Sequence, residues 1–220
     1  MIENFFESSD YSRNLFKIND KNIEEIEKES LEDNVPIVTK EVLNFMIFTA
    51  RGKKPLNILE IGTATGYSGI FLGKIATENG GSFTTIEINP ERHAKAVENF
   101  KKAGIFEKSR LILGDALEEI PKLGKNIEKD QKNMMDFIFI DASKGQYIKF
   151  FENCYKLLNE EGIIFIDNIM FRGLVTEKDE NIPKKYKTIV KRLREFIEKL
   201  NNEYDFVLLP FGDGVGLVRK

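Results

Sequence analysis

The chain has 220 residues, of which 41% are hydrophobic and 31% are charged, a composition typical of one folded domain and not of a disordered chain. No apolar run is long enough to cross a membrane, and the first ten residues are too acidic for a signal peptide, so we expect a cytoplasmic protein with no membrane partner. The net charge of −3 argues against nonspecific nucleic-acid binding over the whole surface, but it permits a local basic patch.

The chain has a single cysteine, Cys154, and a single histidine, His93. One cysteine excludes an intrachain disulfide and a cysteine-based zinc site. His93 lies in a segment with a helical pattern, where we expect it to be solvated. A zinc hydrolase needs several histidines, which argues against that class of enzyme. With its one histidine expected on the surface, a general base in this chain has to be a Lys, Asp, Glu or Tyr side chain.

The first 54 residues are expected to form a helical lid in front of the sheet. Apolar positions in residues 21–31 predict a surface helix, and Pro36 predicts an extended link after it. Thr39 is expected to cap the next helix, which closes at residues 51–55.

Residues 57–68, NILEIGTATGYS, predict a strand, a glycine turn and the start of a helix. Gly62 and Gly66 would let the backbone approach a ligand closely. Their spacing matches neither the dinucleotide nor the phosphate-loop pattern, and Glu60 at the strand end would repel a pyrophosphate. The turn therefore suits a ligand with a cationic or hydroxyl-bearing part, although an ordinary turn can carry the same glycines.

Strands and helices alternate through residues 55–220, which predicts one doubly wound α/β domain. We expect strands at residues 82–88, 110–113, 136–140 and 162–166, and helices at 90–102, 116–123, 147–159 and 184–200. Residues 124–135 are expected to form a polar loop and 169–183 a mobile segment. The last residues, around a Gly-Asp-Gly turn, predict a hairpin of strands 206–209 and 215–219.

Polar residues end successive predicted strands, and in this kind of sheet the carboxyl ends of the strands share one edge. They are Glu60, Glu87, Asp115, Asp141, Asp167 and Asn168. Glu87 can accept both hydroxyls of a ribose, and Asp115 can accept from an exocyclic amine, so the pair implies a nucleoside-bearing ligand. Any one of these acids can instead be a helix cap or a solvated strand end.

Asp141, Asp167 and Asn168 offer only oxygen ligands, which select Mg²⁺ or Ca²⁺ over zinc. The alternative is that Asp141 caps a helix and the other two form a turn. Lys144 follows three residues after Asp141, and beside a metal in a partly dry cleft it could lose its proton and act as a base. Without the neighbouring acids it would be a solvated surface lysine.

Six motifs in this order resemble the cation-dependent, catechol-type O-methyltransferases that use S-adenosylmethionine: LEIGTATGYS, TTIEINPERHAKAVENF, LILGDAL, DFIFIDASKGQY, GIIFIDNIMFRGLV and LPFGDGVGLVRK. The resemblance covers about residues 20–220. It implies a Rossmann-like class I methyltransferase fold, with seven mostly parallel strands and an antiparallel C-terminal hairpin, and it implies a homodimer.

The resemblance also implies a role for each matching residue. Val38, Glu60, Gly62 and Ser68 correspond to contacts with the methionine part of the cofactor, Glu87 to the ribose acceptor, and Asp115 and Ala116 to the adenine neighbourhood. Asp141 corresponds to a cofactor contact and, with Asp167 and Asn168, to an Mg²⁺ ligand, and Lys144 to the general base. A cation that binds a substrate hydroxyl lowers the pKa of that hydroxyl. Chelation by a neighbouring oxygen fixes its angle, so substrates should carry two adjacent oxygens.

DASKGQY, FRGLV and the Gly-Asp-Gly hairpin are similar to the bacterial branch that methylates 5-hydroxyuridine at the tRNA wobble position to 5-methoxyuridine. Ser143 is uncharged, whereas the catechol and caffeoyl branches often have an acid there. An anticodon loop would need basic side chains to hold its phosphates. The candidates are Arg172, Lys184, Lys185, Lys187, Lys191, Arg192 and Arg194, with a second cluster of Arg51, Lys53 and Lys54.

Two alternatives to a tRNA substrate remain open. The basic helix can be an ordinary solvated face, in which case the same chemistry would act on a small catechol-like vicinal diol. The chain can also be a module that binds S-adenosylmethionine without catalysis, although the complete set of Asp141, Lys144, Asp167 and Asn168 argues against this.

Overall fold

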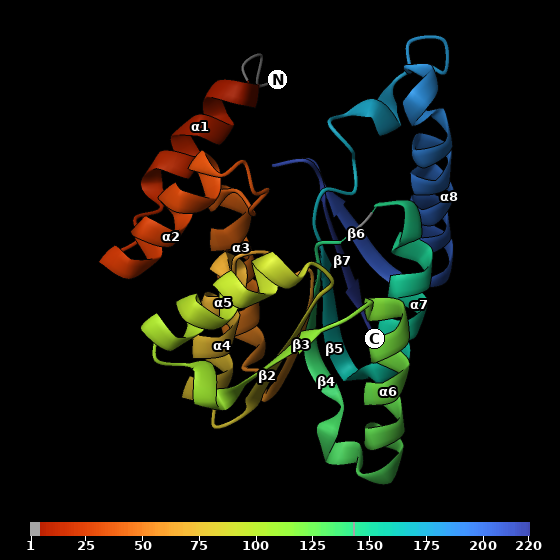
Figure 1. Ribbon diagram of the computed structural model, residues 1–220. Coiled ribbons are helices and arrows are strands. Elements are labelled where there is room, and N and C mark those ends of the chain that lie inside the picture. Colours follow the sequence, from red (N-terminus) through yellow and green to blue (C-terminus); the bar gives the residue numbers. More distant parts are fainter. Residues whose placement is uncertain (1–4, 143) are drawn as a thin grey trace.

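The computed structural model describes the backbone of residues 5–142 and 144–220, and their side chains apart from those of residues 5–9, 126, 128, 129 and 144. A seven-stranded sheet of order β3-β2-β1-β4-β5-β7-β6 runs through its centre (Figure 1). The first five strands are parallel, and β7 pairs antiparallel with β5 and β6. The strands are β1 (Asn57–Ile61), β2 (Ser82–Glu87), β3 (Ser109–Leu113), β4 (Met135–Ile140), β5 (Leu158–Ile166), β6 (Asp205–Leu209) and β7 (Val215–Arg219). The predicted fold class is confirmed.

Helices cover both faces of this sheet (Figure 1). One face carries α1 (Phe5–Leu15), α2 (Lys21–Glu32), α3 (Lys40–Lys53), α4 (Tyr67–Glu78) and α5 (Pro90–Lys102). The other face carries α6 (Ala116–Lys129), α7 (Tyr147–Leu157) and α8 (Lys187–Glu203). Short 3₁₀ turns occur at Phe106–Lys108, Gln131–Asn133, Lys144–Gln146, Leu174–Thr176 and Lys184–Tyr186.

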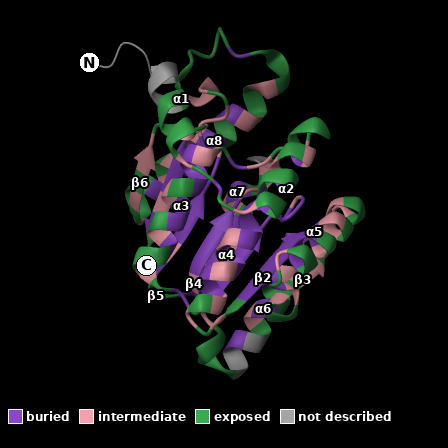
Figure 2. Ribbon diagram, turned by 90° about the vertical axis from the view of Figure 1, so that its left-hand side faces the viewer, coloured by how far each residue is buried: buried purple, intermediate pink, exposed green. Residues whose placement is uncertain are grey.

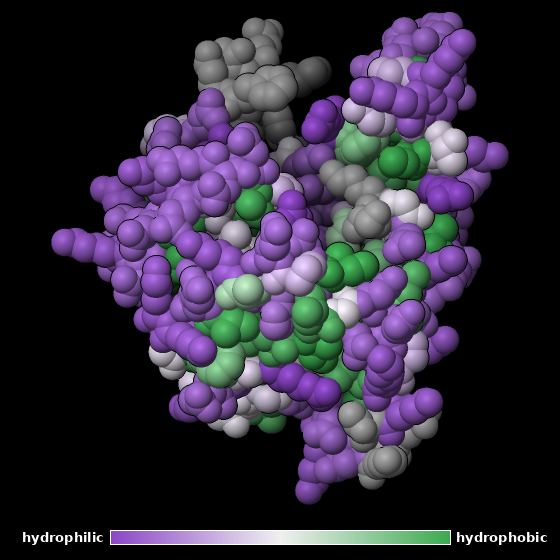
Figure 3. Space-filling view, in the orientation of Figure 1, coloured by the Kyte–Doolittle hydropathy of each residue, from purple (hydrophilic) through white to green (hydrophobic). Residues whose placement is uncertain are grey.

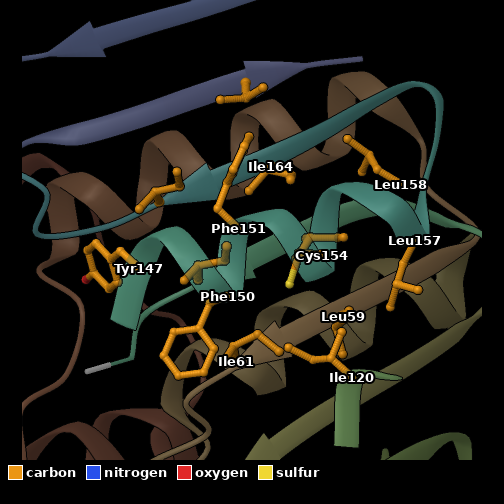
Figure 4. Close-up of a cluster of buried hydrophobic side chains, with 14 of the residues drawn as sticks. Leu59, Ile61, Ile120, Tyr147, Phe150, Phe151, Cys154, Leu157, Leu158 and Ile164 are labelled. Carbon is orange, nitrogen blue, oxygen red and sulfur yellow. The ribbon is translucent and has the colours of Figure 1, made fainter. Parts of the chain in front are cut away.

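The residues of the central strands are mostly buried (Figure 2), as expected of a parallel sheet covered on both sides. In β1, Ile58 belongs to the core under α3 to α5, whereas Leu59 and Ile61 belong to the core under α6 to α8. Cys154 of α7 lies in the second core, fully buried among aliphatic and aromatic side chains (Figure 4). Burial raises the pKa of the Cys154 thiol, so this cysteine has a packing role.

Polar contacts tie the N-terminal helices together and to the sheet layer. Arg13 of α1 donates two hydrogen bonds, each of 2.8 Å, to the carboxylate of Glu41 in α3. Lys74 of α4 forms an ion pair of 3.0 Å with Asp20, which also caps α2. The helix α1 falls in a part of the chain where the sequence pattern gives no prediction.

Two local expectations were wrong, and a third was confirmed. Residues 124–129 continue α6 instead of forming a loop, because Ile120, Leu123 and Ile127 recur at helical spacing and are buried in the core. β5 begins four residues earlier than expected, at Leu158. Thr39 occupies the N-cap position of α3 as predicted, and its side chain makes no capping hydrogen bond.

His93 also differs from the expectation of a solvated side chain. It is half-buried, and its Nε2 atom is buried without a hydrogen-bond partner in the described part of the chain. Among the described residues, no helix is both long and apolar enough to cross a membrane.

Candidate active site

The carboxyl ends of the five parallel strands are joined along one edge of the sheet. Backbone N–H groups that follow one strand donate to carbonyl groups at the end of the next, over 2.9 to 3.1 Å. These bonds run from Gly114 to Glu87, from Gly62 to Ile86, from Asp141 to Ile61 and from Asp167 to Ile140. The predicted residues that follow β3, β2, β1, β4 and β5 are therefore neighbours along this edge.

The glycines of the first turn are explained by contacts within the protein. Gly62 has φ of +99°, and a Cβ atom there would lie 2.0 Å from the carbonyl oxygen of Asp141. Gly66 has φ of +90°, and a Cβ atom there would lie 2.7 Å from the Phe100 ring. The close approach of β1 to β4 and of the turn to α5 requires these glycines, so they are not in themselves signs of a ligand.

Glu60 is the most deeply buried of the predicted acids, with 0% exposure. Ser68 Oγ lies 2.6 Å from one carboxyl oxygen and Thr85 Oγ1 lies 2.7 Å from the other. Burial raises the pKa of Glu60 to about 8, and the negative charges of Asp141 and Glu87 add to this, whereas the two hydrogen bonds oppose it. The carboxyl group has no exposed surface, and its predicted contact with the cofactor stays a prediction.

The Glu87 carboxylate is fixed from both sides. Its two oxygens accept hydrogen bonds of 2.8 Å from the backbone N–H groups of Ala64 and Asn89. Each oxygen keeps a further lone pair, so the ribose-binding role stays chemically open. This contact also holds the glycine turn against the end of β2.

Asp115 stands where α6 begins, and its Oδ1 atom accepts a hydrogen bond of 2.8 Å from the backbone N–H of Leu117. Asp115 thus caps the start of α6, which was the alternative role predicted for it. Its Oδ2 atom takes no part in this hydrogen bond. Ala116 is buried next to it. Ile88 and Leu113, at the ends of β2 and β3, are 67% and 50% exposed and offer an apolar surface beside these acids. This surface was not predicted from the sequence.

The predicted metal ligands come from the ends of β4 and β5. Asp167 is 1% exposed, whereas Asp141 and Asn168 are half-buried. Asn168 has a left-handed backbone with φ of +58°, and its N–H donates to Asp167 Oδ1 over 2.7 Å. The buried hydroxyl of Tyr147 donates to the Asp167 carbonyl oxygen over 2.8 Å.

Tyr147 also reports on the charges around it. Burial raises the pKa of its hydroxyl, and the negative charges of Asp141, Asp167 and Asp213 raise it further. Three carboxylates are thus close enough to this phenol to affect its pKa. No group of three or more His, Cys, Asp or Glu side chains in the described chain is arranged to hold a metal ion, but the predicted set has only two such residues and an amide. Two carboxylates and an amide oxygen fit a hard divalent cation.

Asp213 is a residue that the sequence reading missed, because the Gly-Asp-Gly pattern was interpreted only as a hairpin turn. Its backbone carbonyl accepts from Met170 over 2.9 Å, and its Oδ1 atom accepts from the backbone N–H of Arg172. A Cβ atom at Gly214 would lie 2.3 Å from the Met170 side chain, and one at Gly212 would lie 2.4 Å from that of Val42 in α3. The turn is therefore wedged between α3 and the segment after β5.

The remaining predicted residues divide into described and undescribed ones. Val38 is 4% exposed and packs in the core just before α3. The backbone of Lys144 lies in the 3₁₀ turn that follows β4, but its side chain is outside the described part of the structure, and so is the whole of Ser143. The role of Lys144 as the general base stays a prediction.

The two predicted basic clusters lie at opposite ends of the sheet. Lys184, Lys185 and Lys187 are exposed near the start of α8, and Arg192 on the same helix donates to the Gly145 carbonyl oxygen over 3.4 Å, next to the β4 end. The cluster of residues 51–54 ends α3, just before β1 begins, and thus lies at the amino end of the strands. Arg194 is engaged with the Val175 carbonyl oxygen and with Asp179.

The sequence profile of the O-methyltransferase family matches residues 9–220. The chain belongs to the O-methyltransferase family. Caffeoyl-CoA O-methyltransferase 5 of Nicotiana tabacum is 31% identical over an alignment 212 residues long, which covers 88% of this chain and 85% of the relative. Tapetum-specific methyltransferase 1 of Arabidopsis thaliana is 31% identical over 191 residues, 86% and 78% of the two chains.

Solved structures of O-methyltransferases have the same fold. The SAH-bound methyltransferase PaMTH1 of Podospora anserina matches 99% of this chain and 95% of its own, with a TM-score of 0.81 and 28% identity. TomG of Streptomyces achromogenes, an O-methyltransferase of tomaymycin synthesis in complex with SAM, matches 100% and 99%, with a TM-score of 0.81 and 25% identity. The predicted cation, substrate and homodimer, and the individual site residues, stay predictions.

Proposed function

We propose that this O-methyltransferase transfers a methyl group from S-adenosylmethionine to a hydroxyl that has a second oxygen beside it, with the help of a divalent cation such as Mg²⁺. The observation that carries the proposal is the alignment of strand ends. The predicted cofactor residues follow β3, β2 and β1, the predicted cation residues follow β4 and β5, and Asp141 stands between the two groups. The methyl donor and the activated hydroxyl would thus meet at neighbouring strand ends.

The residues of the chain would divide the work as follows. Glu87, fixed by two backbone N–H groups, would accept the ribose hydroxyls. Asp141, Asp167 and Asn168 would hold the cation, which supplies positive charge that lowers the pKa of the substrate hydroxyl. Lys144, in the turn after Asp141, would take the hydroxyl proton. Tyr147 would keep the Asp167 backbone in place through its hydrogen bond.

For the substrate we propose 5-hydroxyuridine at the tRNA wobble position, which would become 5-methoxyuridine. The O5 and O4 atoms of this base are adjacent oxygens. Supporting it, the exposed basic side chains of residues 184–192 lie at the edge of the sheet that carries the site. The surface there is hydrophilic and borders a hollow between the N-terminal helices and the start of α8 (Figure 3). Such a surface suits the phosphates of an anticodon loop.

A small catechol-like vicinal diol is the second candidate substrate. The names of the relatives favour it, since several are caffeoyl-CoA O-methyltransferases. This candidate uses the same cation and base but needs no phosphate-binding surface. A homodimer is also expected from the family resemblance, and analytical ultracentrifugation tests it.

Two triple variants with the same change of charge separate the substrates. Lys184→Ala/Lys185→Ala/Lys187→Ala removes three positive charges at the site edge, and Arg51→Ala/Lys53→Ala/Lys54→Ala removes three at the opposite end. With an RNA substrate, the first variant should bind tRNA at least about tenfold more weakly at 0.1 M salt and show a shallower salt dependence, because fewer counterions are released. The second variant should bind like the wild type.

The assay is methylation and binding of tRNA that contains 5-hydroxyuridine, with caffeoyl-CoA and a simple catechol tested in parallel. Equal behaviour of the two variants, or methylation of a diol but not of the tRNA, would overturn the tRNA proposal. In the second case the vicinal diol becomes the substrate.

A further inference from the structure

The segment that follows β5 contains a left-handed turn. Phe171, Arg172 and Gly173 have φ angles of +49°, +57° and +74°, so three consecutive residues adopt the left-handed conformation. Residues that carry a Cβ atom avoid this conformation, because the Cβ atom then lies too close to the following carbonyl oxygen, and they rarely adopt it in a run. Such a turn persists only where its surroundings hold it in place.

The turn between β6 and β7 holds this segment. The Gly214 carbonyl oxygen accepts from the backbone N–H of Ile169 over 3.0 Å, and the Asp213 carbonyl oxygen accepts from that of Met170 over 2.9 Å. The Asp213 side chain continues this series, since its Oδ1 atom accepts from the backbone N–H of Arg172. Backbone groups therefore hold the start of the segment, whereas a carboxylate holds the left-handed turn.

Asp213 has a fixed place because both of its neighbours are closely packed glycines. A Cβ atom at Gly212 would overlap the side chain of Val42 in α3, and one at Gly214 would overlap that of Met170. The carboxylate is thus presented by a rigid turn that rests on two different parts of the chain. What this carboxylate can fix is the backbone of the left-handed turn.

The left-handed turn lies beside the basic segment that begins α8. The ring of Phe171 meets the ring of Tyr186 edge to face, with the two centroids 5.2 Å apart. Lys185 Nζ lies 4.7 Å from the centroid of the same Tyr186 ring. The side chains of Arg172 and Lys185 are both exposed. The turn therefore brings the backbone of Arg172 next to a second exposed cation at the edge of the proposed site.

Exposed cations at this place suit an anionic group of the acceptor. A guanidinium group presents its N–H donors in a planar fork that matches the oxygens of a phosphate. Such a fork can bind two oxygens at once only when the backbone that carries it is held in place. tRNA and a CoA ester carry phosphates, whereas a simple catechol carries none. The group that holds the Arg172 backbone can thus decide which acceptors are recognised.

We propose that Asp213 is a positioning residue for acceptor specificity, whose carboxylate fixes the left-handed turn so that Arg172 meets a phosphate group of the acceptor. The inference rests on the proposed function, because it assumes an acceptor at the ends of β4 and β5. Asp213 itself would touch neither the acceptor nor the reacting atoms. RNA and a CoA ester are two sources of the same phosphate chemistry, and each is tested separately.

Asp213→Ala and Asp213→Asn form a matched pair, because both remove the negative charge but only asparagine keeps an oxygen that accepts from the Arg172 N–H. The measurement is kcat and KM for tRNA that contains 5-hydroxyuridine, for caffeoyl-CoA and for a simple catechol. In Asp213→Ala the KM for the phosphate-bearing acceptor should rise about three- to tenfold, with little change in kcat, whereas Asp213→Asn should keep the wild-type KM. Equal KM values for the two variants would overturn the proposal.

A double variant tests whether Asp213 acts through Arg172. Arg172→Ala should raise the same KM at least as much as Asp213→Ala, and the double variant should be no worse than Arg172→Ala alone, because the two residues contribute one interaction. Effects that add would overturn the proposal. Asp205→Ala is the matched control, since it removes a carboxylate at the other end of the same hairpin, where it pairs with Arg219, and it should keep the wild-type KM.

Cofactor binding separates a positioning role from a merely structural one, because the turn around Asp213 also packs against α3. Calorimetry should give Asp213→Ala the wild-type affinity for S-adenosylhomocysteine, since the backbone hydrogen bonds of the turn remain. A loss of that affinity comparable to the rise in KM would mean that the turn has collapsed, and it would overturn the proposal.

The two proposals fail in different ways. If the wild-type chain transfers a methyl group to none of the three acceptors, the proposed function is wrong, and the role of Asp213 falls with it. If the wild type methylates the simple catechol as efficiently as the phosphate-bearing acceptors, the methyl transfer stands and the role of Asp213 does not.

Discussion

Glu60 shows how strand geometry decides what a side chain can touch. It lies on the same face of β1 as Ile58, the face that packs under α4, so its carboxyl group is buried in the core. The sequence already contains this alternation. An interpretation of the strand ends as a row of exposed acids, without the two-residue period, does not predict this burial. The contact of Glu60 with the cofactor stays a prediction.

The raised pKa of Glu60 has a consequence for stability that can be measured. The same carboxyl group titrates near 4.5 when unperturbed, but near 8 in the folded chain. Between these values the folded state holds a proton that the unfolded state has released, so the free energy of unfolding falls as pH rises, by about 1.4 kcal/mol per pH unit from this group. Below pH 4.5 the contribution is fully present.

Glu60→Gln cannot titrate and should therefore lack this loss. Its free energy of unfolding relative to the wild type should rise by roughly 3 kcal/mol between pH 5 and pH 7.5, as measured by urea denaturation at both pH values. The difference between two proteins at two pH values cancels the titration of all other groups. Parallel pH profiles for the two proteins would show that Glu60 is ionised in the folded chain.

At the scale of elements, α2 is fastened to the glycine turn by one buried pair of hydroxyls. Ser30 Oγ donates to the Ile26 carbonyl oxygen over 2.6 Å, so in its 2.8 Å contact with Thr65 Oγ1 the threonine is the donor. Asn99 of α5 donates to the Thr65 carbonyl oxygen over 2.8 Å from the other side. The turn is thus held between α2 and α5.

Ser30→Ala leaves the buried Thr65 hydroxyl without this partner. We expect a loss of about 1–3 kcal/mol in the free energy of unfolding and a weaker affinity for S-adenosylhomocysteine, because the turn loses its hydrogen bond to α2. Thr49→Ala is the matched control, since the Thr49 hydroxyl bonds to the Phe45 carbonyl oxygen in its own helix. If both variants have the same affinity for the ligand, α2 does not support the turn.

Elements with local signals were predictable from the sequence, and elements without them were not. α5 begins and ends where expected, because Asn89 caps it with two side-chain hydrogen bonds and Pro90 occupies the first turn. α6 was predicted too short, since its last turns are polar except for the buried Ile127. The wedge formed by the hairpin turn around Asp213 depends on contacts between distant segments, and no local pattern announces it.

At the scale of the whole molecule, topology carries most of the site. Once the strands are parallel and ordered around β1, their carboxyl ends must meet, so the convergence of Glu87, Asp141 and Asp167 follows from the alternating pattern. Which surface charges share an end does not follow from composition. The two basic clusters look equivalent in the sequence, and only the direction of α3 relative to β1 places one of them away from the site.

The central claim is cation-dependent methyl transfer, and its most direct test is transfer of labelled methyl from S-adenosylmethionine to the preferred acceptor, before and after removal of divalent ions. We expect EDTA to abolish transfer, added Mg²⁺ to restore it, and Asp167→Ala to lose both transfer and the binding of Mn²⁺ detected by electron paramagnetic resonance. Undiminished transfer in EDTA, or full Mn²⁺ binding by Asp167→Ala, would contradict the account.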